Sequence, residues 1–153
     1  MKEHILNYLE LNPNLGYNDL VKIFGLSLEE LLELLGISKF NIDKFNKLRF
    51  YDDNGYEIYT EHSDSYWEKC EYDINNNKIY EEFSTGYWKK YMFNKDGKQI
   101  YYENSDGGWE KRKYDVNNNL TYFENSNDFW IKYEWDDGNC VYRKDSYDYI
   151  NIY

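Results

Sequence analysis

The sequence predicts an α+β protein in which a small N-terminal three-helix segment precedes a tandem-repeat, antiparallel β meander. Three observations predict this class. Four tryptophans recur every 21 residues, aromatic residues make up 21% of the chain, and the first 40 residues carry a helical pattern instead of the repeat. Self-similarity at a fixed period is typical of repeat architectures, and Tyr, Trp and Phe favour a pleated, half-buried surface.

Residues 1–40 are expected to form three short amphipathic helices in a helix-turn-helix-like arrangement. Ser27 and Glu30 form a capping box for the third helix, and Gly25 and Gly36 end the second and third helices. A DNA-reading helix needs Arg, Lys, Asn or Gln on its polar side. Here that side carries Glu29, Glu30 and Glu33. A helical cap or protein-docking bundle is therefore favoured over DNA reading.

Residues 41–48 form a polar connector, expected as a loop or short helix, and residues 49–153 form an array of five β-hairpin units. About nine or ten twisted strands are expected, with the helices covering one face or end of the sheet. Open sheets of this strand number tend to curl, so both an open and a rolled sheet are compatible with the pattern. Tyr147–Tyr153 is expected to form the last edge strand.

Turn signals fall at two places in each unit. The first signal, expected as a two-residue type I′ loop, is Asn54-Gly55, Asn75-Asn76, Asp96-Gly97 and Asn117-Asn118. The second, expected as a three-residue loop ending in the left-handed region, is Ser63-Asp64-Ser65, Ser84-Thr85-Gly86, Ser105-Asp106-Gly107 and Ser126-Asn127-Asp128. Loops of two and three residues leave an even number of strand residues, so each face of the sheet is preserved from unit to unit.

This register predicts rows of like side chains on one face, which we call the ladder face. It pairs Lys90 with Glu103 and Tyr72 with Ile79. The aromatic members of the ladder face are Trp67, Trp88, Trp109, Trp130, Tyr59, Tyr80, Tyr101 and Tyr122. Its charged members are Lys69, Lys90, Lys111 and Lys132 with Glu61, Glu82, Glu103 and Glu124. Cross-strand packing explains these rows, and sugar stacking on the rings is the functional alternative.

Charge limits the range of partners. The chain carries a net charge of −11, and residues 49–153 alone carry 13 basic and 22 acidic side chains. Such a field repels phosphate backbones, so direct nucleic-acid binding is disfavoured and a protein with a basic surface is the expected partner. The carboxylates outside the ladder rows form the candidate acidic surface: Glu68, Glu71, Glu81, Asp106, Glu110, Asp136 and Asp137. Their alternative role is solubility.

The sequence favours a cytoplasmic protein without a membrane segment. It contains no apolar run of membrane length and no signal-peptide pattern. Cys70 and Cys140 occupy non-equivalent repeat positions, so two reduced thiols are expected instead of a disulfide framework.

No catalytic, cofactor or metal motif is present in the sequence, and no enzyme activity is expected. His4 and His62 lie in different segments, and no phosphate loop or zinc pattern occurs. The Asp73-x-Asn75-x-Asn77 and Asp115-x-Asn117-x-Asn119 loops imitate calcium-ligand spacing but lack the downstream bidentate Glu. Turn chemistry explains them without a metal.

The Asp96-Gly97-Lys98 turn followed by Ile100-Tyr101-Tyr102 resembles bacterial and phage aromatic hairpin repeats, in particular the MORN-like repeats of antitoxin-type proteins. The Gly108-Trp109 step with the Tyr-rich strand before it is also similar to choline-binding cell-wall repeats. The resemblance covers residues 49–153 and concerns the class of repeat alone.

The expected function is that of a non-enzymatic, acidic protein-interaction module. Its narrower form is a phage- or mobile-element-encoded inhibitor of the anti-CRISPR or anti-restriction type, which docks by DNA mimicry on the basic nucleic-acid-binding surface of a host defence nuclease. The alternative is a carbohydrate or cell-wall binding module that uses the Trp and Tyr face. Salt-dependent binding would favour the first hypothesis, and quenching of Trp fluorescence by glycans would favour the second.

Overall fold

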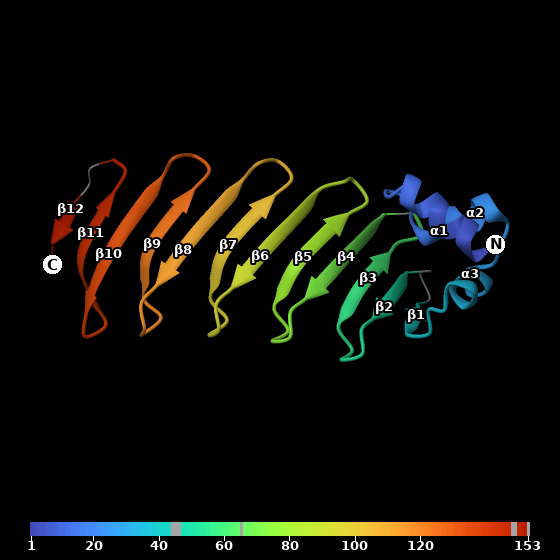
Figure 1. The fold of residues 1–153 in the computed structure, drawn as a ribbon, viewed down its shortest axis with the longest axis horizontal. Helices are drawn as coiled ribbons and strands as arrows, with labels where there is room; N and C mark the ends of the chain where they lie inside the picture. Colours follow the sequence, from blue (N-terminus) through green and yellow to red (C-terminus); the bar gives the residue numbers. More distant parts are fainter. Residues whose placement is uncertain (44–46, 65, 148–149, 153) are drawn as a thin grey trace. The chain divides into compact units, whose positions relative to one another are not determined.

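The computed structural model describes residues 1–43, 47–64, 66–147 and 150–152. Three helices come first: α1 (Lys2–Leu11), α2 (Tyr17–Phe24) and α3 (Leu28–Leu35). Twelve strands follow, and their order in the sheet is their order in the chain (Figure 1). They are β1 (Phe40–Ile42), β2 (Leu48–Tyr51), β3 (Glu57–Glu61), β4 (Trp67–Tyr72), β5 (Lys78–Phe83), β6 (Trp88–Phe93), β7 (Gln99–Asn104), β8 (Trp109–Tyr114), β9 (Leu120–Asn125), β10 (Trp130–Asp136), β11 (Asn139–Asp145) and β12 (Ile150–Ile152).

The predicted fold class is confirmed: three helices precede an antiparallel meander, and β1 and β12 are its two outermost strands, so the described sheet is not closed. The predicted count of about nine or ten strands was too low, and the two outermost strands are short. One is β1, in the segment expected as a loop or short helix, which pairs Phe40 with Phe50 and Ile42 with Leu48. The other is β12, the predicted edge strand, which pairs Tyr142 with Ile152.

The chain divides into two compact units, and each is described by itself. The helical unit comprises Met1–Glu71 and Glu81–Tyr87, and the C-terminal unit comprises Tyr72–Tyr80 and Trp88–Tyr153. The predicted domain boundaries at residues 40 and 48 stay a prediction.

The helices begin and end where the sequence predicted. The hydroxyl Oγ of Ser27 accepts the Glu30 N–H at 3.2 Å, and the Glu30 carboxylate accepts the Ser27 N–H at 2.7 Å, which completes the capping box of α3. Gly25 and Gly36 follow α2 and α3 with φ of 63° and 80°, a left-handed conformation that glycine adopts without steric penalty. These local signals are sufficient to set the helix bounds.

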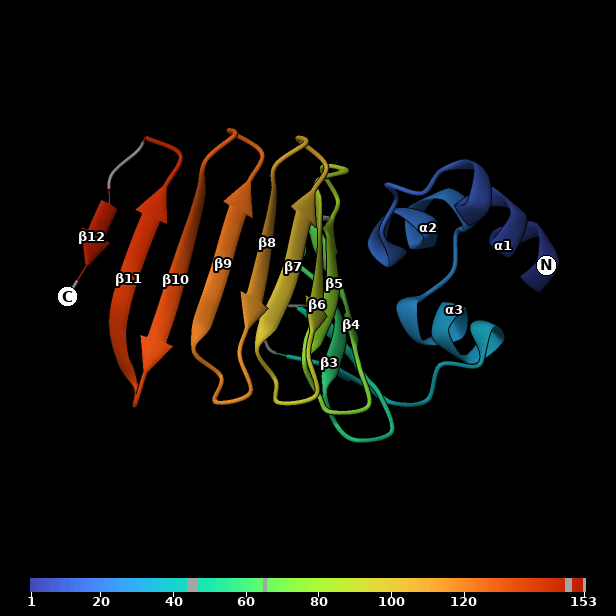
Figure 2. The same ribbon diagram turned by 60° about the vertical axis from the view of Figure 1, so that its left-hand side comes forward.

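The helical unit has two buried apolar clusters. Ile5, Leu20 and Leu31 form the first, between the three helices. The second joins α3 to the sheet, because Leu32 packs with Leu48 and Phe50 of β2. The helices therefore lie against the first strands of the sheet within this unit (Figure 2).

The first turn of each unit differs from the prediction. The Asn94 N–H donates to Lys98 O at 2.9 Å and the Gly97 N–H donates to Asn94 O at 3.0 Å, which leaves a three-residue loop between Asn94 and Lys98. Gly97 alone has a positive φ, 75°, whereas a type I′ turn requires two such residues. The same pattern of hydrogen bonds repeats at the other three first turns. The two-residue prediction was wrong, because Asn-Gly and Asp-Gly also fit a type I turn that ends in a left-handed residue.

The second turn confirms the prediction at its described positions. Gly86, Gly107 and Asp128 have φ of 81°, 83° and 58°. The Phe83 N–H donates to Tyr87 O, and the Asn104 N–H donates to Gly108 O, each across three residues. Ser65, the last residue of the predicted loop at Ser63, lies outside the described residues.

A β-bulge restores the parity that two three-residue loops would destroy. Met92 pairs with Tyr101, but Phe93 pairs with Gln99, so Ile100 is an extra residue in β7. The same shift leaves Thr121 extra in β9. One extra residue per unit compensates for the longer first loop, so side chains keep their faces. The predicted pairing of Tyr72 with Ile79 corresponds to Phe93 with Ile100 in the next unit, and this pairing does not occur, because Phe93 pairs with Gln99.

The ladder face forms as predicted. Tyr101 pairs with Lys111 and Glu103 pairs with Trp109 between β7 and β8. The predicted charge pairs Lys90–Glu103 and Lys111–Glu124 are also in register. Side chains that are directly opposite in an antiparallel pair point to the same face. Within the C-terminal unit, Trp, Lys, Tyr and Glu thus occupy the same face of β6 to β10.

Candidate binding surfaces of the ladder face

In the helical unit, the ladder face already holds a helix. The Glu61 carboxylate accepts the N–H of Tyr17 at 2.7 Å, the N–H of Asn18 at 2.9 Å and the hydroxyl of Tyr59 at 2.7 Å. Tyr17 and Asn18 are the first residues of α2, whose N-terminal amides have no partner within the helix. A carboxylate at this end also complements the helix dipole. Glu61 therefore caps α2 from the sheet, and its side chain is completely buried.

Rings complete this contact between helix and sheet. Tyr17 packs edge-on against Phe50 and Tyr59, with ring centroids 4.9 and 5.2 Å apart. The indole N–H of Trp67 donates to the carbonyl of Asn14 at 3.0 Å. Burial, followed by the negative charge of Glu61, raises the pKa of both the Tyr17 and the Tyr59 hydroxyl. Both phenols thus stay neutral hydrogen-bonding groups at physiological pH.

The approach of α2 to the sheet leaves no room for a side chain at the residue before it. A Cβ built at Gly16 collides with the Glu61 carboxylate. Gly16 has φ of −88°, which any residue can adopt, so its requirement here is steric and not conformational.

In the C-terminal unit, the same ladder residues are engaged with each other. The Tyr101 hydroxyl donates to the Glu103 carboxylate at 3.1 Å, as Tyr59 does to Glu61. Burial, followed by this hydrogen bond and the Glu103 charge, raises the pKa of Tyr101. Three ladder tryptophans have the lysine two residues on over their rings: Lys90, Lys111 and Lys132 lie 4.8, 4.6 and 5.5 Å from the ring centroids of Trp88, Trp109 and Trp130.

The exposure of the predicted aromatic residues varies along the array. Trp67 is buried under the helical segment, whereas the other three tryptophans are half-buried. Tyr59, Tyr80, Tyr101 and Tyr122 are half-buried. A sugar that stacked on the later tryptophans would have to displace the lysine that lies over each ring. Cation–π contacts of this kind are worth about 0.5–1 kcal/mol at exposed sites.

The seven candidate carboxylates are divided between the two units, three in the helical unit and four in the C-terminal unit. In the helical unit, Glu68 and Glu81 lie on the face opposite the ladder, where Glu81 is buried, and Glu71 is exposed on the ladder face 3.8 Å from Lys69. The carboxylates of this unit thus have different surroundings and do not form one patch.

In the C-terminal unit, the other four carboxylates are also divided. Glu110 forms an ion pair with Arg112 on the opposite face. Asp106 lies in the exposed loop before β8. Asp136 and Asp137 are exposed neighbours at the hairpin between β10 and β11, which is at the other end of the strands. Among the four candidates of this unit, Asp136 and Asp137 lie together.

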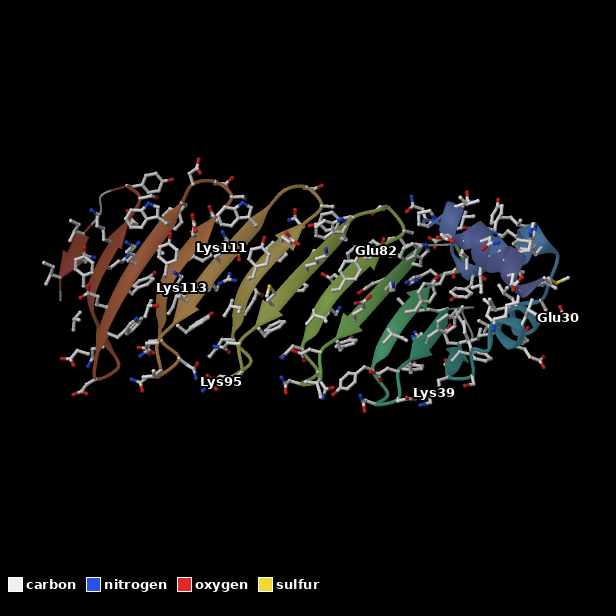
Figure 3. All side chains as sticks on the ribbon, viewed as in Figure 1. Glu30, Lys39, Glu82, Lys95, Lys111 and Lys113 are labelled. Carbon is white, nitrogen blue, oxygen red and sulfur yellow. The ribbon has the colours of Figure 1, made fainter. Side chains whose placement is uncertain are left out.

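A hollow of about 650 Å³ lies on the ladder face over β8 to β11. Its charged lining consists of Lys111, Lys113, Lys132, Glu124 and Glu134. Lys111 and Lys113 come from the same strand (Figure 3) and, two residues apart, share a face. Tyr122 and Tyr142 are the ladder-face rings of this lining. The sequence analysis did not predict this hollow. Lys113 was the available signal, because the other units carry Glu71, Met92 and Glu134 at its position.

The calcium-like loops use their carboxylates internally. The Asp73 Oδ1 accepts the N–H groups of Asn75 and Asn77 at 2.8 and 2.9 Å, and Asp115 repeats these contacts in the fourth unit. The Asn77 side chain, followed by its backbone N–H, holds the pKa of Asp73 below its usual value. Among the described residues, no group of three or more His, Cys, Asp or Glu side chains is arranged to hold a metal ion.

The cysteines and helices add two observations. Cys70 and Cys140 are both free thiols. Within the described part of the chain, none of the helices combines the length and apolar character that crossing a membrane requires.

Comparison with known proteins finds no family model that matches the chain and no curated protein with a matching sequence. The resemblance to aromatic hairpin repeats therefore stays a prediction from the sequence, and no family is assigned. The chain is an α+β protein whose sheet is a long antiparallel meander of hairpins with aromatic clusters.

Proposed function

We propose that the protein is a non-enzymatic interaction module that binds a basic protein partner. The observation that carries this proposal is the seating of α2 on the ladder face of the first unit. There, rings and one carboxylate bind a polypeptide segment by its backbone N–H groups. The same Tyr–Glu–Trp set recurs along the array as Tyr101, Glu103 and Trp109 and as Tyr122, Glu124 and Trp130. Rings and carboxylates on one face can pack against a polypeptide and accept its backbone N–H groups, which favours binding over catalysis.

Charge supports a basic partner. The array carries −9 over residues 49–153, and Asp106, Asp136 and Asp137 are exposed at the ends of its hairpins. Carboxylates on such loops can reach a partner without the burial of a charge inside the sheet. Long-range attraction of this kind speeds association and is screened by salt.

We propose a basic protein as the partner and do not extend the proposal to DNA mimicry. DNA mimicry would need carboxylates spaced like phosphates along one surface, and the described carboxylates lie on both faces and at both ends of the strands. The carbohydrate alternative, in the form of stacking on the half-buried tryptophans, is disfavoured because a lysine lies over each of these rings.

Affinity capture from a cell lysate at low salt, followed by salt-step elution and mass spectrometry, tests the proposal. We expect basic proteins to elute as salt rises, and the Kd of a reconstituted pair to weaken with ionic strength. The triple variant Asp106→Lys, Asp136→Lys, Asp137→Lys should weaken that pair. A matched control is Lys95→Met, which leaves the carboxylates in place. Capture of neutral partners alone, at an affinity that high salt does not change, would contradict the proposal.

A further inference from the structure

The outermost strand of the C-terminal unit, β12, has the properties of an edge that can pair with a further strand. β12 has β11 as its one neighbour in the described sheet (Figure 1). It contains neither a charged residue nor proline, the side chains with which edge strands commonly prevent pairing with another chain. In the helical unit, by contrast, the outermost strand β1 stands between Lys39 and Asp43, which form ion pairs with Asp53 and Arg49.

The hydrogen bonds of β11 determine which backbone groups of β12 point outwards. Along an antiparallel strand, the N–H and C=O groups of successive residues point alternately to one neighbouring strand and to the other. The N–H of Ser146, directly after β11, donates to the carbonyl oxygen of Trp130 at 2.9 Å, so Ser146 faces β10. Arg143 lies three residues before Ser146 and therefore faces β12.

This alternation directs the backbone groups of both isoleucines of β12 to the open edge. Asn151 lies opposite Arg143 in the register, so it faces β11. The N–H and C=O groups of Ile150 and Ile152 therefore point away from β11. Their side chains share one face of the strand, and they are 51% and 80% exposed. The edge thus combines outward hydrogen-bonding groups with exposed apolar side chains.

The last hairpin is neutral, although the array is strongly acidic. Residues 139–152 carry two basic side chains, Arg143 and Lys144, and two acidic ones, Asp145 and Asp148. The net charge of −9 on residues 49–153 therefore belongs entirely to residues 49–138. A second copy of this acidic chain meets the least electrostatic repulsion at a neutral edge.

The sequence of β12 is complementary to itself under two-fold symmetry. In an antiparallel register centred on Asn151, Ile150 lies opposite Ile152 of a second copy, and Ile152 lies opposite Ile150 of that copy. Both pairs occupy positions at which opposite residues exchange N–H and C=O bonds. The aliphatic side chains also meet directly across the two strands. A two-fold contact of this kind is closed, so it produces a dimer and not a fibre.

We propose that β12 is a self-association site, at which two copies of the chain pair edge to edge with Ile150 of each copy opposite Ile152 of the other. Because the contact is short, the dimer is weak, with a Kd of about 0.1–1 mM. This site is independent of the basic partner proposed above, and either can fail without the other. Salt distinguishes them: screening reduces the repulsion between two chains of −11 and strengthens the dimer, whereas it weakens the binding of a basic partner.

Sedimentation equilibrium of the full chain, at micromolar to millimolar concentrations and at low and high salt, tests the proposal. We expect the average mass to rise from the monomer value of 18.8 kDa toward twice that value, and to rise further in high salt. Amide hydrogen exchange gives a second measurement that needs no variant. The amides of Ile150 and Ile152 should exchange more slowly as the protein concentration rises, and the amide of Asn151, which faces β11, should depend less on concentration.

Variants at position 152 separate edge pairing from other contacts. Proline is tolerated on an edge strand where the missing N–H would face outwards, so Ile152→Pro should preserve the monomer. It should weaken the dimer at least about tenfold, because each copy loses a hydrogen bond. Ile152→Lys should have a similar effect, because it places a charge opposite Ile150 of the second copy. Val116→Lys makes the same change of net charge at a loop residue that is 97% exposed, and it should leave the Kd unchanged.

A double variant tests the register. When Ile150→Glu is added to Ile152→Lys, each lysine lies opposite a glutamate of the second copy, so association should return. Circular dichroism of each variant verifies that the monomer is folded.

Four results would overturn the assignment. They are a chain that stays monomeric at millimolar concentration, association that continues beyond the dimer, a dimer that weakens as salt rises, and an unchanged Kd in both Ile152 variants. Continued loss of association in the double variant would refute the register centred on Asn151.

Discussion

The first ladder unit and the later ones carry the same Tyr–Glu–Trp set but use it differently. In the first unit, Glu61 is buried and caps a helix, whereas Glu103 in the third unit lies beside Lys90 with its Oε1 3.9 Å from the lysine Nζ. Two positions differ between these units, and the first is the one opposite the glutamate: Leu48 stands in the first unit where the third unit carries the ladder lysine Lys90. An apolar residue at this position lets a helix pack on the rings. A lysine at this position covers the rings with its own side chain.

The comparison shows that the repeated Tyr–Glu–Trp set does not have the same role in every unit. Phe50 and Tyr59 stack with centroids 5.1 Å apart and give Tyr17 an apolar floor. Further along the array, Lys113 stands in the place of Phe50 and lies over Tyr122, 5.5 Å from its ring centroid. Changes at two positions per unit therefore decide whether the ladder face binds a helix or faces solvent.

The largest expected effect is that of Leu48→Lys, which gives the first unit the ladder lysine of the others. Leu48 is completely buried between α3 and the sheet, and burial of an ammonium group there should destabilise the protein by about 3–4 kcal/mol. Urea unfolding followed by circular dichroism measures this. The matched control, Lys111→Leu, should change the unfolding free energy by no more than about 0.5 kcal/mol. Similar values for the two variants would remove the proposed difference between the units.

The next effect compares Glu61→Gln with Glu103→Gln. A glutamine at position 61 cannot accept from both helix N–H groups and the Tyr59 hydroxyl, so a buried donor loses its partner, at a cost of about 2 kcal/mol. The same exchange at Glu103 breaks an exposed ion pair and should cost about 0.5 kcal/mol. Denaturant midpoints of the two variants, measured side by side, check the ratio. An equal loss in both would mean that Glu61 has no special role as a cap.

A smaller effect is expected for Gly16→Ala. The new methyl group meets the Glu61 carboxylate, so α2 must shift on the sheet, which we expect to cost about 1.5 kcal/mol. Because the backbone at Gly16 suits any residue, the loss reports on docking and not on strain. In the background of Glu61→Gln, the additional loss should shrink, and full additivity of the two losses would argue against a direct contact.

The smallest effect concerns pH and the first turns. The lowered pKa of Asp73 means that its turn contributes stability at pH values above the unfolded pKa, and that this contribution is lost as pH falls through the folded pKa. The Asn77 side chain is the largest cause, so Asn77→Ala should raise the Asp73 pKa toward its ordinary value. For Asp115, the largest cause is the backbone N–H of Asn119, so Asn119→Ala should have a weaker effect. Carbon-detected NMR titration of the carboxyl groups measures both. A larger change at Asp115 would reverse the predicted order.

Much of the architecture could be predicted from the sequence because it depends on local signals and on the repeat. The capping box at Ser27, the glycine ends of α2 and α3, and the rows of like side chains on one face all follow from spacing. The loop length of the first turn did not follow from the spacing of residues. Its signal was the residue before the loop: Asn94 Oδ1 accepts the N–H groups of Asp96 and Lys98 at 3.0 and 2.9 Å, a contact that sets a three-residue loop.

The candidate site was harder to predict, because it depends on exceptions to the repeat. Glu61 belongs to a regular row, and its capping role follows from its distant partner Tyr17. Leu48 and Lys144 depart from the repeat, which the sequence shows. Their effect depends on the residues opposite them in the sheet, Glu61 and Lys132. The acidic surface was predicted from net charge and from carboxylates outside the ladder rows, and neither of these places a residue on one face of a strand.

Amide hydrogen exchange at Tyr17 and Asn18 tests the central claim most directly. The first amides of a helix have no partner within it and normally exchange quickly. Because both donate to Glu61, we predict that they exchange as slowly as the amides of the paired core of β2 and β3, and that Glu61→Gln accelerates at least one of them. Exchange of both amides at the rate of an unprotected peptide in the unaltered protein would show that the ladder face does not hold the helix.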